Sequence, residues 1–436
     1  MLPRRSLMVF PSPRMERRVS CLKGMLFPVF LLGAGGAAHA QVDYRLTAGL
    51  AGLATDNPVS QTPGQPTKAD VSVALRGSAD LGYLGRFATD RLSYGIMATV
   101  WSRDTQGSGL THTLRLSSDI EATPSIRVGL SAGATLTQLA LADTVSAASL
   151  PTTGPQPTSP QPSTSQQVGP QPAGDQKILT LDVRESFSWQ PNGQLRVDQG
   201  LSGNEYRPLG SGSGSIDNKA LTLDFGVARL WQQDSAGLRG RLGVMMTSGS
   251  AAGGQPTAES RYTEMAESLL VWGHQWGAGV AHDLSAGVTV IRSEKARPML
   301  AASAGVSWQH PGFVLSGRLA QTADYGIMAG AAYQRSAATL AVGLPVNRFE
   351  TMRLMASATI EHDSQIGASN ESGGSINVFN AQAGLGWQPG DTFAYSLAYT
   401  FRDQWASGAG DNPSAVTSFR RQTIMFTVSA GYGGIF

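Results

Sequence analysis

Hydrophobic side chains alternate with small, polar or charged side chains along most of the chain. Between positions 126 and 136, the even positions hold Ile, Val, Leu and Ala, and the odd positions hold Arg, Gly, Ser and Thr. The segments 179–189, 352–361 and 393–402 show the same period of two. This period predicts β-strands, because successive side chains of a strand point to opposite faces.

The length of these alternating runs bears on the kind of sheet. The run 126–136 covers 11 residues, whereas strands of soluble proteins are usually about 5–6 residues and tilted membrane-spanning strands about 9–11. Because lipid cannot hydrogen-bond to backbone groups, strands cross a membrane only as a closed barrel. We therefore predict an all-β protein, a transmembrane antiparallel up-and-down β-barrel, with its apolar face toward lipid and its polar face toward the lumen.

Tryptophans precede turn-forming residues at regular intervals. Trp189 and Trp387 are followed by Gln-Pro, and Trp308 is followed by Gln-His-Pro-Gly. Tryptophan favours the membrane–water interface, where the ring is half buried and its N–H stays wet, and Pro and Gly favour tight turns. This pattern predicts a membrane-interface girdle that consists of Trp189, Trp231, Trp272, Trp308 and Trp387.

The tryptophan spacing also predicts the number of strands. The steps are 42, 41 and 36 residues and then 79, which is about twice one step and indicates a further turn near 345–348. With turns near 88–90 and 123–125, this gives eight short turns. Nine longer polar connections are expected, at 55–68, 103–109, 142–176, 207–218, 249–259, 293–297, 323–326, 363–373 and 405–417.

These connections imply a barrel of about 18 strands, with both ends of the chain in the periplasm, since bacterial barrels have an even strand number. The alternative is 16 strands. The segment 313–349 leaves the count open, because 325–344 could be one long strand or a hairpin near 335–336.

Residues 1–40 read as a signal peptide ahead of a single barrel domain, 41–436. Basic residues at 17, 18 and 23 precede the apolar run 25–32, and Ala-His-Ala at 38–40 fits a cleavage site. A membrane anchor is disfavoured, because a spanning helix needs about 20 apolar residues. Cys21, the only cysteine, lies in the signal segment, so a disulfide or a cysteine nucleophile is excluded from 41–436.

The segment 142–176 is rich in Pro, Ser, Thr and Gln. Such a composition buries no core and predicts a disordered loop, here on the extracellular side. We interpret it as a spacer, with partial cover of a pore mouth as the alternative.

Charge is sparse: 15% of residues are charged and the formal net charge is +2, which argues against nucleic acid as a partner. By strand parity the inward face carries several charges, which predict a polar lumen with a mild positive bias. The alternative is that cross-strand pairs, such as Asp182 with Arg196 and Arg184 with Asp198 across a turn at 190–193, only keep the wall solvated. The predicted pore-lining residues are Arg115, Arg127, Asp182, Arg184, Arg196, Asp198, Arg239, Arg241, Arg353 and Arg402.

The sequence contains no arrangement of residues that stands out as a catalytic site, and we predict that the protein is not an enzyme. His282-Asp283 and His362-Asp363 look like dyads, but neighbouring side chains in a strand point to opposite faces and cannot cooperate. No His, Asp or Glu cluster has the spacing of metal ligands, and no glycine motif that cradles phosphate is present. We therefore expect no catalytic residue, no metal and no cofactor.

The chain ends "TIMFTVSAGYGGIF", in which Tyr432 and Phe436 share the apolar face. This segment resembles the terminal strand of Gram-negative outer-membrane proteins, and the whole pattern resembles a porin-like barrel. The resemblance implies an outer-membrane location, contact with outer-membrane lipid, and assembly by the barrel assembly machinery, which reads a C-terminal Phe. Tyr432 and Phe436 would form that assembly signal.

The segment "YRLTAGLAGLATDNP" near the N-terminus resembles the opening of outer-membrane barrels encoded with exopolysaccharide export systems. This resemblance implies passage of a secreted polysaccharide and a periplasmic exporter as partner. Only Thr55, Asp56 and Asn57 carry over, without a catalytic role.

Together these observations predict an outer-membrane channel for passive passage of hydrophilic solutes, with secreted polysaccharide as the preferred cargo. Two alternatives stay open. One is a general or anion-leaning porin for small solutes, and the other is a structural or surface-anchoring barrel with a closed lumen.

Overall fold

The computed structural model describes residues 41–57, 69–103, 109–138, 177–209, 216–249, 261–277, 279–293, 296–326, 331–347, 351–366, 375–390, 392–407 and 418–435. The predicted signal segment 1–40, the loop 142–176 and Phe436 lie outside these residues. Within the described part of the chain, no helix is long and apolar enough to cross a membrane.

The described residues form eighteen strands of 13 to 17 residues. They are β1 (Gln41–Thr55), β2 (Asp70–Leu84), β3 (Ala88–Trp101), β4 (Gly109–Thr123), β5 (Ile126–Gln138), β6 (Lys177–Asn192), β7 (Leu195–Leu209), β8 (Ile216–Leu230), β9 (Asp234–Gly249), β10 (Arg261–Gln275), β11 (Val280–Arg292), β12 (Ala296–His310), β13 (Phe313–Gly326), β14 (Ala331–Pro345), β15 (Met352–Ile366), β16 (Ser375–Trp387), β17 (Phe393–Ser407) and β18 (Phe419–Ile435).

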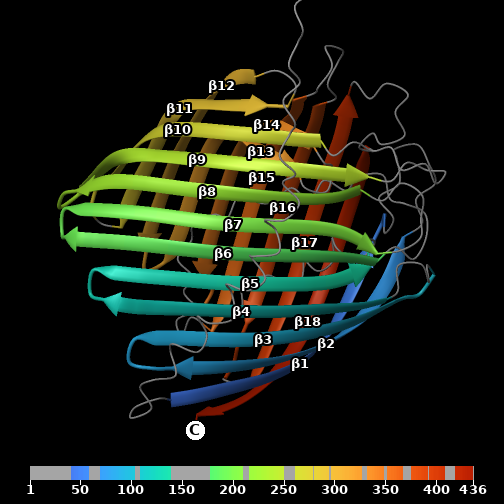
Figure 1. Ribbon diagram of the computed structural model, residues 1–436. Coiled ribbons are helices and arrows are strands. Elements are labelled where there is room, and N and C mark those ends of the chain that lie inside the picture. The colour runs from blue at the N-terminus through green and yellow to red at the C-terminus, as the bar shows by residue number, and fades with distance from the viewer. Residues whose placement is uncertain are drawn as a thin grey trace, which may run out of the picture.

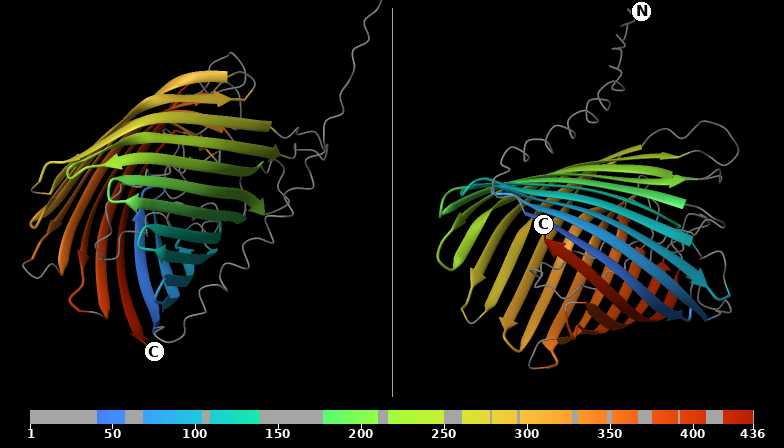
Figure 2. Two further views of the ribbon diagram at one scale, coloured as in Figure 1. Left: turned by 60° about the vertical axis from the view of Figure 1, so that its left-hand side comes forward. Right: turned by 90° about the horizontal axis from the view of Figure 1, so that it is seen from below.

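The strands close into one antiparallel barrel (Figures 1 and 2). Each strand pairs with its neighbours in sequence, and β18 pairs with β1. The up-and-down topology and the count of 18 are confirmed, and the alternative of 16 strands is wrong. Residues 335–336 lie inside β14 rather than in a hairpin, because β13 and β14 are separate strands joined through 327–330.

Short turns lie at one end of the barrel, here called the turn end, and longer connections lie at the other, the loop end. Each of the eight predicted short turns is found within a few residues of its expected position. The turn predicted at 88–90 lies instead at 85–87, where the Gly85 N–H donates to the Ala88 carbonyl at 2.8 Å. The connection predicted at 323–326 is also displaced, since β13 continues to Gly326.

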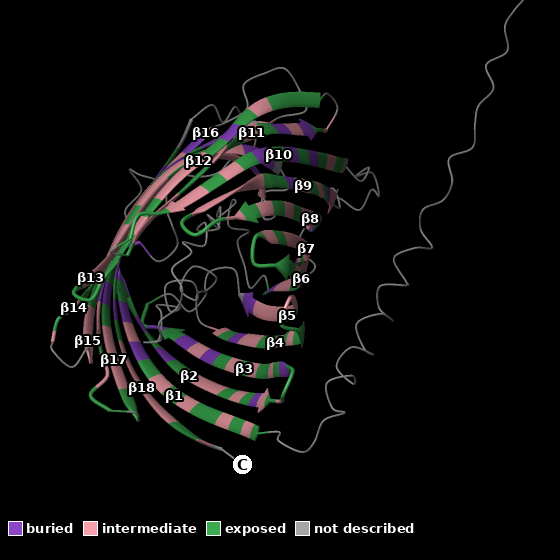
Figure 3. Cartoon of the chain, turned by 90° about the vertical axis from the view of Figure 1, so that its left-hand side faces the viewer, coloured by how far each residue is buried: buried purple, intermediate pink, exposed green. Residues whose placement is uncertain are grey.

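The hydrophobic side chains that would form the core of a soluble protein are exposed on the outside of the barrel. Leu270 is 67% exposed and Leu300 73%. Exposure alternates along the strands, as the banding in Figure 3 shows. An apolar outward face is stable in lipid, where the backbone groups are satisfied by the closed ladder. The alternation of the sequence is therefore that of a transmembrane barrel.

The seam between β1 and β18 is held beyond the end of the ladder by the residues that follow β1. The Asp56 carboxylate accepts a hydrogen bond from the backbone N–H of Gln422 at 2.7 Å, and the Asn57 amide donates to the carbonyl of Arg420 at 2.9 Å. Asn57 is only 2% exposed. Asp56 and Asn57 of the Thr-Asp-Asn segment thus have a structural role, because their hydrogen bonds hold β18 against the end of β1.

The wall departs from a regular barrel where β12 meets β13. Ladder pairs join 302–310 of β12 to 313–321 of β13. Among the described residues, 296–301 of β12 have no ladder partner in β13, although they pair with β11 along their whole length. The two strands therefore separate toward the loop end.

Beyond this separation, the loop ends of β13 and β14 fold into the barrel. Ala323 and Tyr325 lie on the same face of β13 as Leu319, which is 62% exposed on the outside. Ala323 nevertheless packs with Met265, an inward-facing residue of β10, and the Tyr325 hydroxyl donates to a backbone carbonyl of β10 at 3.3 Å. One face of β13 thus contacts lipid near the turn end and the inside of the barrel near the loop end. We call 322–326 and 331–335 the infolded hairpin.

Candidate functional site

The strands enclose an internal cavity of about 2190 Å³. Residues of β1 and of β3–β18 line this cavity. Its lining carries many charged side chains on the inward faces of these strands. Eleven arginines and nine carboxylates belong to it, which leaves two net positive charges. Buried charges are stable only when they are paired, hydrogen-bonded or hydrated, and the ion pairs on this wall do not account for all of its charged groups. The cavity is therefore an aqueous lumen.

Nine of the ten residues predicted as pore-lining belong to this lining: Arg115, Arg127, Asp182, Arg184, Arg196, Asp198, Arg239, Arg241 and Arg402. The tenth, Arg353, is the second residue of β15, next to the turn end, and is not part of the lining. That these side chains act on a passing solute stays a prediction.

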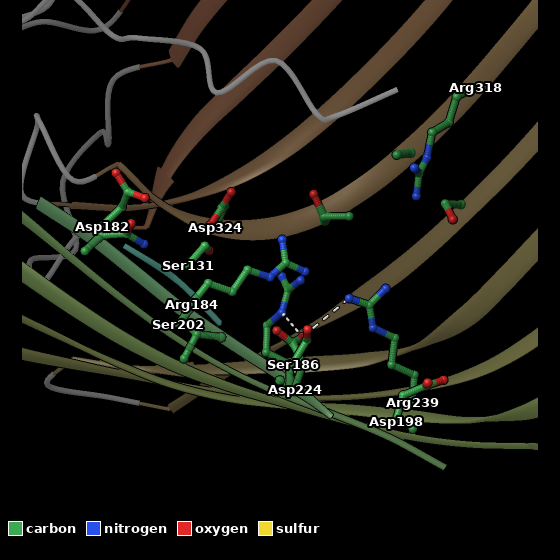
Figure 4. A pocket seen from close by; sticks show the side chains of 18 of the residues that line it. Ser131, Asp182, Arg184, Ser186, Asp198, Ser202, Asp224, Arg239, Arg318 and Asp324 are labelled. Atoms are coloured by element: carbon green, nitrogen blue, oxygen red, sulfur yellow. Dashed lines mark hydrogen bonds and ion pairs between the residues drawn. The ribbon is translucent and has the colours of Figure 1, made fainter. Parts of the chain in front are cut away.

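A hydrogen-bonded charged cluster surrounds Asp224 on the wall of the cavity (Figure 4). Asp224 of β8 lies opposite Arg241 of β9, and its carboxylate accepts hydrogen bonds from Arg241 Nε at 2.9 Å and Arg239 Nη2 at 3.4 Å. Their side chains are 25–48% exposed. Because two guanidinium groups share one carboxylate, the cluster has a local excess of positive charge.

The predicted pairs of Asp182 with Arg196 and of Arg184 with Asp198 are wrong. The register between β6 and β7 places Asn204 opposite Asp182 and Ser202 opposite Arg184, because the strands reverse at 193–194. Arg196 instead pairs with Asp198 of its own strand at 2.8 Å.

Several cavity-lining arginines are therefore free to meet a solute. Within the described part of the chain, Arg115, Arg184 and Arg318 form no ion pair or side-chain hydrogen bond. Arg318 was not among the predicted residues; its alternation with Leu319 along β13 was the signal that could have found it. Figure 4 shows Arg184 and Arg318 projecting into the cavity. These three side chains supply unpaired positive charge on both sides of the lumen.

The lumen differs between its two ends. Toward the loop end, inward-facing side chains of β8–β11 are almost fully buried, with Asn218 0%, Met245 1% and Ile291 1% exposed. The infolded hairpin covers part of this surface, because Tyr325 packs against the position of Gly243, where an added Cβ would lie 3.0 Å from its ring. The infolded hairpin therefore narrows the lumen near its loop end.

The five predicted girdle tryptophans lie beside the short turns on the outward face, and each is 40–49% exposed. Trp387 stacks on Tyr395 at 5.1 Å between ring centroids, and Trp308 meets Phe313 edge-on at 4.7 Å. Tyr432 of the predicted assembly signal is 69% exposed on the same face. Their roles as girdle and assembly signal stay predictions.

The His-Asp neighbours point to opposite faces of the wall. Asp283 lines the cavity, whereas His282 lies outside, where its Nδ1 accepts a hydrogen bond from Trp276 Nε1 at 2.7 Å. Asp363 faces inward and His362 contacts Asn377 on the outside at 2.7 Å. No cluster of three or more potential metal ligands occurs among the described residues. Neither dyad can share a proton across the wall.

Comparison with known proteins finds distant structural likenesses. They include OccAB3 of Acinetobacter baumannii (8% identity, 90% of this chain and 99% of that chain, TM-score 0.45) and OpdK of Pseudomonas aeruginosa with vanillate (8%, 91% and 99%, 0.43). The siderophore receptor PirA of Pseudomonas aeruginosa is similar at 9% identity over 88% and 80% of the two chains, with a TM-score of 0.43. No family model and no curated protein matches the chain. By its closed topology and apolar outward face the chain is a transmembrane β-barrel, and these likenesses assign it neither a family nor a cargo.

Proposed function

We propose that the barrel is an outer-membrane channel for passive passage of hydrophilic solutes. The observation that carries the proposal is the internal cavity of about 2190 Å³ lined by eleven arginines and nine carboxylates. Barrels of 16–18 strands leave room for an aqueous channel. Charged side chains along the wall can hydrogen-bond to a hydroxyl-rich or ionic solute throughout its passage, whereas they make no favourable contact with an apolar molecule.

Secreted polysaccharide is the preferred cargo. A polysaccharide chain presents hydroxyl or carboxylate groups at every sugar, and a guanidinium group can fork to a carboxylate and stack on a ring face. The unpaired Arg115, Arg184 and Arg318 support this cargo, as does the resemblance of the N-terminal segment to barrels of export systems. Asp56 and Asn57 of that segment do not add to this support, because their side chains hydrogen-bond across the seam.

A small-solute porin with a lean toward anions is the second candidate. It is favoured by the infolded hairpin, which narrows the loop end and would obstruct a polymer more than a small anion. A barrel with a closed lumen is the third candidate, favoured by the near-complete burial of Asn218 and Ile291 on the inward face.

Single-channel conductance of the purified chain in a planar bilayer tests these candidates. A channel gives discrete conductance steps, and the absence of any step would overturn both channel candidates in favour of the closed barrel. Block of the current by alginate, an acidic polysaccharide, but not by small sugars supports the polysaccharide cargo. A current that neither alginate nor small sugars block supports the small-solute porin.

An arginine variant separates a lumen effect from a general one. Arg184→Glu should shift the reversal potential toward cations and weaken the block by alginate, because it replaces an unpaired positive charge in the lumen. Arg229→Glu is the matched control: Arg229 lies on the outward face of β8, over the ring of Trp231 at 5.4 Å. Equal shifts from both variants would show that Arg184 does not meet the permeating ion.

A further inference from the structure

A groove lies on the outer surface of the barrel where β12 and β13 separate. Its volume is about 570 Å³, within the range of about 300–1,000 Å³ that small-molecule sites span. The separation exposes the edge of β12 along 296–301, and the infolding of β13 leaves the hollow beside it. Alanines and two large apolar side chains dominate the outward part of its lining: Ala302, Ala304, Leu319, Ala338 and Ile360.

The groove begins within the hydrocarbon layer. Six residues separate Trp308, at the turn end of β12, from Ala302 at the separation. At about 3.3 Å per residue and a strand tilt of about 35–45°, Ala302 lies about 15 Å above the tryptophan level. Because the apolar band of such barrels is about 25 Å tall, the groove opens toward the outer leaflet.

A row of polar side chains crosses the outward face beside the groove. Gln321 pairs with Ser336, Ser336 with His362 and His362 with Asn377 in the ladders of β13–β16. The neighbouring row, two residues nearer the turn end, is apolar and consists of Leu319, Ala338, Ile360 and Phe379. Polar and apolar surfaces thus lie side by side, in register over four strands.

The polar row slants into the membrane. Asn377 is ten residues above Trp387, which places it about 25 Å above the tryptophan level, at the outer boundary of the apolar band. Ladder pairs run perpendicular to tilted strands, so the row descends from Asn377 to Gln321, about 15 Å above that level. Polar groups at membrane depth are costly and usually mark a functional site.

We propose that the groove binds an acyl chain of an outer-leaflet amphiphile, whose amide, ester or hydroxyl group is hydrogen-bonded by the polar row. The groove is continuous with the lipid-facing surface, since Leu319 and Ile360 on its wall are 62% and 58% exposed. Within the described residues, Gln321 and Ser336 have no side-chain hydrogen bond of their own. The row contains no carboxylate, lysine or arginine, so it suits uncharged polar groups rather than a phosphate.

The chemistry of the surroundings selects a lipid chain as the occupant. A peptide strand would add to the free edge of β12, but the part of that edge beside the groove, 299–301, lies at membrane depth, where acyl chains are the abundant species. The small side chains of Ala302, Ala304 and Ala338 leave a hollow deep enough for a chain of methylene groups. Because the surrounding lipid is itself apolar, the affinity of such a chain comes from close van der Waals contacts with the groove rather than from transfer out of water.

Lipid retention measured by native mass spectrometry tests the acyl-chain part. The full chain, delipidated in detergent and checked for folding by its gel mobility, is titrated with dipalmitoyl phosphatidylethanolamine. The unmodified chain should retain one tightly bound lipid, and the double variant Ala304→Leu/Ala338→Leu should bind it at least about tenfold more weakly because it fills the groove. Ala132→Leu/Ala134→Leu, on the outward face of β5, is the matched control and should bind normally. Equal binding by all three chains, or equal loss in both variants, overturns the proposal.

A second comparison tests the polar row. Gln321→Leu should weaken binding of N-palmitoylglucosamine, which carries an amide and hydroxyls, severalfold and leave binding of hexadecane unchanged. Equal effects on both ligands, or none on either, would overturn the role of the row. This readout is independent of channel activity, so it holds whether the barrel conducts or not.

Discussion

Replacing Arg335 with Met should destabilise the barrel far more than removing an arginine from its turn end. Arg335 Nε lies 3.0 Å from Asp363 Oδ1, and Arg335 Nη2 lies 3.3 Å from Asp363 Oδ2. The Asp363 side chain is 0% exposed and that of Arg335 is 12% exposed. Removing one partner of a buried pair leaves an uncompensated charge and costs about 3–5 kcal/mol. Asp363 has other polar neighbours, so we expect about 3 kcal/mol, a factor of more than 100 in the folding equilibrium.

The matched control is Arg127→Met. Arg127 pairs with Glu121 at 3.1 Å, but the two side chains are 72% and 63% exposed. Such pairs contribute about 0–1 kcal/mol, because water screens them and the side chains lose entropy. The two substitutions remove the same chemical group from strands of the same barrel, so their difference reports burial.

Urea unfolding of the chain in phospholipid vesicles, followed by tryptophan fluorescence and gel mobility, measures both free energies. The double variant Arg335→Met/Asp363→Asn completes the comparison. It should recover a large part of the loss, because it also removes the buried charge that Arg335→Met leaves behind. Equal losses for Arg335→Met and Arg127→Met, or a double variant that is strictly additive, would refute the electrostatic reasoning.

Three further predictions concern other parts of the barrel. Tyr325→Ala should raise single-channel conductance, because it removes a ring of the infolded hairpin from the lumen. Tyr262→Ala, on the outward face, is the control and should leave conductance unchanged. Unchanged conductance in both variants would show that the hairpin does not limit ion flow. Asp56→Ala should cost about 1–3 kcal/mol in the same unfolding assay, by leaving a backbone N–H of β18 without its charged acceptor, and should speed amide exchange along the seam. Trp308→Leu should cost about 0.5–1.5 kcal/mol beyond lost area, and combining it with Phe313→Leu should cost less than the sum, since the two rings form one pair.

The period of two and the tryptophan step predicted most of the fold, because both depend on geometry that every strand shares. A tilted strand must be long enough to cross the membrane, and an interfacial Trp precedes each of several turns. The hydrogen-bonding register between neighbouring strands was harder to predict from the sequence. The turn between β6 and β7 was predicted at 190–193 and lies at 193–194, and so small a displacement changes which residue faces Asp182. Lining residues follow from parity, whereas their ion pairs depend on register.

The infolded hairpin was not predicted, for a physical reason. Leu319, Ala323 and Tyr325 alternate with polar residues in the same way whether their face meets lipid or the apolar side chains of another sheet, because both surroundings favour apolar groups. The segment 313–349 was nonetheless the one where the strand count stayed open. A better signal was available in Gln321, a polar residue on an otherwise apolar face.

The position of Gln321 links the groove to the infolding. It is the last residue of β13 that pairs with β12, and two residues later Ala323 packs inside the barrel. At that point the face of β13 leaves the lipid, and the edge of β12 loses its partner at membrane depth. Backbone and side-chain polar groups exposed there need hydrogen-bond partners, since hydrocarbon supplies none. The polar row and the infolded hairpin therefore have one cause, the opening of the ladder, and an amphiphile at the groove would satisfy the groups that this opening exposes.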